Sequence, residues 1–175
     1  SMGALQSLED QLAGLFKDLP ALPKGAKDLL VSWWPYLALI LGALQLLAAW
    51  GLYQLANWSS AYLDSLNRLS QYTTGTSVGY SDTDKMIIYG GVALLAVNAV
   101  IFFMAYSPLT KKAKRGWDLL FLASVINVVY GIVQIFMSGR GIGSFLVSLV
   151  GSAIGFYLLF QIRERYSASK TAKKA

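Results

Sequence analysis

The side chains that could do chemistry within the apolar parts of this chain are neutral amides and hydroxyls. Asn127, Tyr130 and Gln134 are three and four residues apart, so a helix would carry them on one face. Gln45 and Asn98 fall near the middle of two other apolar runs. We predict that these five residues form an intramembrane polar cluster. The cluster either joins helices by hydrogen bonds, which we favour, or lines a path for a neutral solute.

The composition excludes several classes of catalytic and metal site. The chain has no His and no Cys, which removes thiolate chemistry, Cys-type zinc sites, iron–sulfur clusters and the usual haem ligand. The close pair of carboxylates beside an apolar run, Asp82 and Asp84, fits a helix N-terminus better than a metal site. We therefore predict that the protein is not an enzyme and holds no metal or cofactor.

Four long apolar runs must position these side chains, and they lie near residues 36–56, 86–106, 119–137 and 142–162. Each is close to the ~20 residues that a helix needs to cross a bilayer, and none contains Asp, Glu, Lys or Arg. Short links make consecutive helices neighbours in space. The sequence predicts an all-α, polytopic membrane protein with an up-down-up-down bundle of four transmembrane helices.

The basic residues are unevenly placed and predict the topology. The link between the second and third runs contains Lys111, Lys112, Lys114 and Arg115, and further basic residues precede the first run and follow the fourth. By the positive-inside rule both termini face the cytoplasm, which we place inside a bacterial inner membrane. We expect the four link residues to contact anionic lipids rather than nucleic acid, and Asp118 to pair with Lys114 and Arg115.

The segment before the first run divides into short parts. Residues 1–2 read as the remainder of a cleaved tag. Residues 3–19 predict an amphipathic helix, because their large apolar residues recur at steps of three and four. The helix either packs on the cytoplasmic face of the protein, docks a protein partner through residues 5–19, or lies alone at the interface. Residues 24–166 then form the membrane domain, and residues 167–175 a disordered basic tail.

Two details of the first run follow from its sequence. Pro35 is expected in the first turn of the first span, where a missing N–H costs little. Residues 57–72 keep the helical spacing beyond the apolar run. They predict either an outward extension of the first span or a separate helix on the outer surface.

Gly151 and Gly155 form a GxxxG motif in the fourth run, which allows helix backbones to approach closely. The motif predicts either packing within the bundle or a contact between copies in a homo-oligomer.

Two segments resemble parts of small uncharacterised bacterial four-helix membrane proteins. One is the run Ile154–Arg163 with Tyr166, and the other is the link Pro108–Trp117 followed by Asp118, Leu119, Leu120 and Phe121. The resemblance implies an inner-membrane location and no known activity. The absence of His, Cys and acidic residues from the apolar runs favours a non-enzymatic structural or accessory subunit that binds protein partners or membrane lipids. The alternative is an oligomeric transporter or channel for a small neutral or lipid-like solute.

Overall fold

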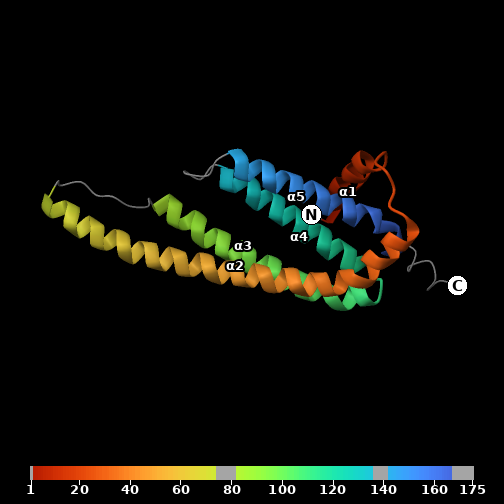
Figure 1. Ribbon diagram of the computed structural model, residues 1–175, viewed down its shortest axis with the longest axis horizontal. Coiled ribbons are helices and arrows are strands. Elements are labelled where there is room, and N and C mark those ends of the chain that lie inside the picture. The colour runs from red at the N-terminus through yellow and green to blue at the C-terminus, as the bar shows by residue number, and fades with distance from the viewer. Residues whose placement is uncertain (1, 74–81, 136–141, 167–175) are drawn as a thin grey trace.

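The computed structural model describes residues 2–73, 82–135 and 142–166, and all its regular elements there are helices (Figure 1). The prediction of an all-α fold is confirmed for these residues. The elements are α1 (Met2–Phe16), α2 (Lys24–Thr73), α3 (Asp82–Thr110), α4 (Lys114–Ile135) and α5 (Ile142–Gln161).

Three of these helices contain segments long and apolar enough to cross a membrane. The segments are Lys24–Gln54, Ile88–Thr110 and Lys114–Ile132, and each overlaps one of the first three predicted runs, although its ends differ. In the fourth run, the apolar stretch found among the described residues is shorter, Leu149–Gln161. Large apolar side chains such as Ile40, Leu47 and Val100 are exposed, which favours lipid rather than water around these helices.

The helix α2 continues without a break from Lys24 to Thr73. At 1.5 Å per residue it is about 75 Å long, more than twice the thickness of a bilayer core. In Figure 1 its later, yellow part reaches well past the ends of α4 and α5. Residues 57–72 therefore extend the first span, and the alternative of a separate surface helix is wrong.

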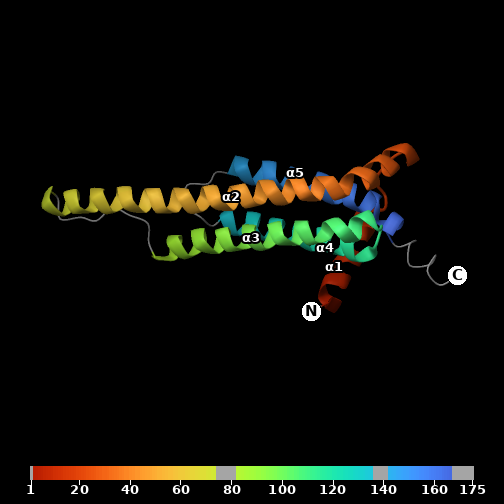
Figure 2. The same cartoon turned by 90° about the horizontal axis from the view of Figure 1, so that it is seen from below.

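Pro35 does not lie in a first helical turn, contrary to the prediction, because α2 begins at Lys24 and encloses it. A proline inside a helix removes the hydrogen bond to the carbonyl four residues earlier and favours a bend. The first turns of α2 diverge from the axis of its long straight part (Figure 2). The apolar run marks the span rather than the start of the helix, because α2 already includes Lys24, Lys27 and Asp28 before that run.

Extensive packing joins α2 to α3, α3 to α4 and α4 to α5, so consecutive long helices are neighbours. Among the described residues no comparable packing joins α5 back to α2. The four long helices therefore form an open arrangement rather than a closed ring, and α1 lies across the end formed by α4 and α5 (Figures 1 and 2).

The turn between α3 and α4 is tight. Lys112 has a positive φ of 52°, and the Ala113 N–H donates to the Pro108 carbonyl at 2.9 Å. A Cβ on Gly116 would lie 2.8 Å from the backbone nitrogen of Leu109. Only glycine lets the start of α4 approach the end of α3 this closely.

Aromatic rings hold α5 against α4 at the end of the molecule nearest α1. Trp117 stacks on Phe121 at 5.5 Å between ring centroids, and its indole N–H donates to the Leu159 carbonyl at 2.8 Å. Phe160 meets the Trp117 ring edge-on at 5.4 Å and stacks on Phe16 of α1 at 5.5 Å. The core of the described protein is therefore concentrated at this end.

The predicted basic tail, residues 167–175, falls outside the described residues.

Candidate functional site

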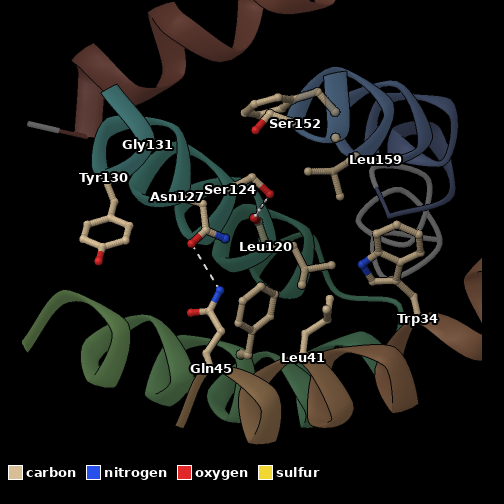
Figure 3. A pocket seen from close by; sticks show the side chains of 14 residues that line it. Trp34, Leu41, Gln45, Leu120, Ser124, Asn127, Tyr130, Gly131, Ser152 and Leu159 are labelled. Atoms are coloured by element: carbon tan, nitrogen blue, oxygen red, sulfur yellow. Dashed lines mark hydrogen bonds between the residues drawn. The ribbon is translucent and has the colours of Figure 1, made fainter. Parts of the chain in front are cut away.

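Three of the five predicted polar residues meet between helices. Asn127 of α4 accepts hydrogen bonds at its Oδ1 from Gln45 Nε2 of α2, at 3.1 Å, and from Asn98 Nδ2 of α3, at 2.8 Å. Figure 3 shows the Gln45 amide directed at Asn127. One side chain therefore links all three of the candidate spans through neutral hydrogen bonds.

The other two predicted members are placed differently. Tyr130 packs on α3, where its hydroxyl would lie 2.9 Å from a Cβ on Gly91. Gln134 belongs to α4, but its side chain lies outside the described part of the structure. The sequence gives no indication that the Tyr130 ring packs against Gly91.

A groove of about 430 Å³ lies beside the amide cluster, and we call it the α2–α4–α5 groove (Figure 3). Its apolar wall includes Leu41, Leu120 and Leu159, whereas Gln45 and Asn127 supply amides. Along α4 its lining runs from Leu120 to Gly131, about 16 Å at the helical rise. The groove is thus elongated along the helices and has polar groups toward one end.

Gly151 and Gly155 line this groove from α5. Within the described residues, no atom outside their own helical turn lies within 4 Å of a Cβ built on either glycine. The structure therefore shows no helix packed on the GxxxG motif, and the predicted packing within the bundle is not seen there. The small residues instead widen the groove at the open edge between α5 and α2.

A buried ionic cluster holds α1 in place. The Glu9 side chain is only 3% exposed, and its Oε1 lies 3.0 Å from Lys114 Nζ of α4 and 2.7 Å from an Arg163 guanidinium nitrogen. Lys114 also lies 4.2 Å from the centroid of the Trp117 ring. One carboxylate therefore connects α1 to α4 and to the segment after α5.

The apolar face of α1 packs on the protein's own core through Leu5, Leu8, Leu12 and Phe16. Leu15 is 73% exposed, on the other side of the helix. The ion pairs of Glu9 with Lys114 and Arg163 were not predicted from the sequence, although the spacing of Glu9 indicated that it faces inward. Glu9 is four residues after Leu5 and three before Leu12, within the apolar face.

The linker between α1 and α2 is tied to the end of α5. The Leu22 N–H donates to Gln161 Oε1 at 2.9 Å, and the Tyr157 hydroxyl donates to the Pro20 carbonyl. Arg165 pairs with Asp28 in the first turns of α2. Burial raises the pKa of Tyr166, beside this region, to about 12.

The four basic residues of the α3–α4 link differ in their surroundings. Lys111, Lys112 and Arg115 are exposed, as a lipid contact requires. Lys114 is mostly buried and pairs with Glu9 and, at 2.6 Å, with Asp118. The expected pairing of Asp118 is therefore confirmed for Lys114, whereas no ion pair from Asp118 to Arg115 is found among the described residues. Lys114 in this arrangement is not placed to meet a lipid headgroup.

No group of three or more acidic side chains that could hold a metal ion occurs in the part of the chain that the structure describes. Comparison with protein-family models, with curated proteins and with solved structures finds no match to this chain.

Proposed function

We propose that this chain is a non-enzymatic, multi-pass membrane protein of the accessory or structural type, which binds a lipid chain in the α2–α4–α5 groove. The observation that carries the proposal is the groove itself, open at the edge where the described residues of α5 and α2 do not pack extensively. In a bilayer, lipid tails would surround that edge.

The size of the groove favours a chain over a protein helix. Its volume of about 430 Å³ lies within the usual range of small-ligand sites, ~300–1,000 Å³. A helix with its side chains is ~10–12 Å in diameter, which is wider than an acyl chain. Gly151 and Gly155 leave room for methylene groups, and the apolar wall suits them.

The hydrogen bonds of Asn127 support a joining role for the polar cluster. Gln45 and Asn98 both use their amide N–H groups on Asn127 rather than pointing them along a channel. For this reason we place transport of a neutral solute second to lipid binding.

We further propose four spans, with α5 as the fourth, both termini in the cytoplasm and a bacterial inner membrane as the location. Support comes from the basic α3–α4 link and from the length of the apolar run at 142–162. A protein partner of α1 would meet Leu15 and the polar face, since Leu8 and Leu12 pack inward. Leu15→Ser should then remove that partner from a pull-down.

Native mass spectrometry of the protein released from lipid nanodiscs tests lipid binding. We expect the unaltered protein to retain one lipid beyond those removed by mild activation. Gly155→Leu places a side chain in the groove and should reduce this retention several-fold. Ala153→Leu is the matched control, because Ala153 is exposed on the same helix and does not line the groove.

Equal retention by Gly155→Leu, Ala153→Leu and the unaltered protein would refute the groove as a lipid site. A dimer lost only in Gly155→Leu would instead assign the GxxxG face to contact between copies. A bound protein in place of lipid would favour the partner-binding form of the accessory role.

A further inference from the structure

We propose that a second groove, between α1 and α4, binds one anionic glycerophospholipid, with its phosphate on Arg115 and an acyl chain along the apolar face of α4. This site is separate from the α2–α4–α5 groove and does not depend on it. We call it the α1–α4 groove.

The walls of the α1–α4 groove are suited to an acyl chain. It has a volume of about 300 Å³ and is lined by Leu5, Gln6 and Glu9 of α1 and by Arg115, Asp118, Leu119, Phe121 and Leu122 of α4. Half of these eight residues are apolar, and they supply a wall for the chain. Gln6 carries an amide whose Nε2 lies 3.4 Å from Asp10 Oδ1 and that can also donate to a phosphate oxygen.

Polarity changes along this face of α4 in the same order as along a phospholipid. Arg115, Leu119 and Leu122 are spaced by four and three residues, so they share one face of the helix. Arg115 lies in the first turn of the candidate span Lys114–Ile132, where a membrane surface would lie, and the two leucines lie deeper. A headgroup at Arg115 would place its tail against Leu119 and Leu122.

Charge complementarity selects an anionic headgroup. Arg115 is exposed, and no ion pair to it is found among the described residues, whereas Glu9 and Asp118, which also line the groove, are already paired. A guanidinium binds a phosphate by two parallel hydrogen bonds, which suits a phosphodiester. Lys111 and Lys112, exposed in the preceding link, add positive charge nearby.

Nanodiscs that contain phosphatidylglycerol and phosphatidylcholine in equal amounts provide the test, since they present both membrane faces whatever the topology. Native mass spectrometry reports which lipid is retained. We expect the unaltered protein to favour phosphatidylglycerol, and Arg115→Gln to reduce this preference about fivefold, the effect of one cation near a lipid surface. Lys111→Gln removes the same charge outside the groove and should change the preference little.

A second pair of variants tests the apolar wall. Leu119→Trp should expel the retained lipid, whereas Val129→Trp, at an exposed position on α4, should not. Leu5→Trp repeats the test from the α1 side if Leu119→Trp fails to fold. Inorganic phosphate added to the nanodiscs should leave the lipid in place.

Equal losses in Arg115→Gln and Lys111→Gln would show only diffuse attraction to the membrane surface and overturn the site. Retention of the lipid by both Trp variants would overturn it as well. Displacement by inorganic phosphate would show that the headgroup alone is bound. Gly155→Leu should not alter the phosphatidylglycerol preference, so this proposal and the α2–α4–α5 groove succeed or fail separately.

Discussion

At the scale of single residues, the Asn127 side chain connects three of the long helices. It accepts from both Gln45 and Asn98, and Asn98 is 1% exposed. We predict that Asn127→Leu lowers the free energy of unfolding in detergent by about 1 kcal/mol, because two buried amides lose their acceptor. Chemical denaturation followed by circular dichroism would measure this loss.

The complementary variant replaces all three amides by leucine and leaves no buried amide of the cluster without a partner. If the cluster joins helices, this triple variant should recover most of the stability lost in Asn127→Leu. A triple variant that folds normally but abolishes a measured solute flux in proteoliposomes would contradict our interpretation and favour transport.

Tyr166 should make the free energy of unfolding depend on pH at high pH. Burial raises its pKa to about 12 in the folded protein, whereas an exposed tyrosine has a pKa of about 10. Between these values the unfolded state binds fewer protons, so the free energy of unfolding should fall as pH rises. Tyr166→Phe should remove that fall, measured as the difference in melting temperature between the two proteins from pH 9 to pH 11.

Below pH 9 the two proteins should show the same dependence on pH, because Tyr166 is then neutral in both states. A parallel decline of both proteins above pH 10 would mean that Tyr166 does not cause the loss. In an ultraviolet titration of the folded proteins, Tyr166→Phe should lack one of the tyrosines that ionise at the highest pH.

At the scale of elements, α1 depends on its buried carboxylate. Removing the charge of Glu9 breaks its buried ion pairs with Lys114 and Arg163, which then keep only their pairs with the more exposed Asp118 and Asp10. We predict that Glu9→Gln weakens α1 docking by on the order of 3 kcal/mol, the usual cost of breaking a buried pair. Hydrogen exchange in the Leu5–Phe16 segment should then be much faster.

Asp18→Asn is the matched control for Glu9→Gln. It changes the net charge by the same amount at an exposed position just after α1. Unchanged exchange in Glu9→Gln, or equal acceleration in the control, would show that the apolar residues of α1 suffice for docking.

The α3–α4 turn is an element whose geometry depends on one missing side chain. Gly116→Ala would place its Cβ 2.8 Å from the backbone nitrogen of Leu109, which cannot move aside as a flexible side chain can. We predict a loss of about 1–3 kcal/mol, measured by thermal unfolding in detergent. Gly131→Ala, in the same helix with nothing within 4 Å, should be neutral or raise stability by about 0.5–1 kcal/mol.

At the scale of the whole molecule, regular features were predictable and pairwise contacts were not. Apolar length located the spans in α2, α3 and α4, because a bilayer sets that length. The spacing of Asn127 marked a polar face, but its partners Gln45 and Asn98 depend on how α2 and α3 pack. Likewise, the open edge beside Gly155 depends on how α5 and α2 are placed relative to each other. The spacing of residues within one helix does not predict that placement.

The distribution of basic residues predicts the topology of the chain, and this is the last prediction. If both termini are cytoplasmic, α1 and the extension of α2 beyond Gln54 must lie on opposite sides of the membrane. The chain has no cysteine, so single substitutions provide clean reporters. Gln11→Cys in α1 and Asp64→Cys in the extension are both at exposed positions.

In intact bacterial cells permeable only at the outer membrane, a membrane-impermeant maleimide should label Asp64→Cys and leave Gln11→Cys unlabelled. Disrupting the inner membrane should make both equally reactive, which controls for local accessibility. Labelling of Gln11→Cys alone before disruption would invert the topology and place the basic α3–α4 link outside, against the positive-inside rule. Equal labelling of both would remove α2 as a span, since one helix crossing the bilayer must separate its two ends.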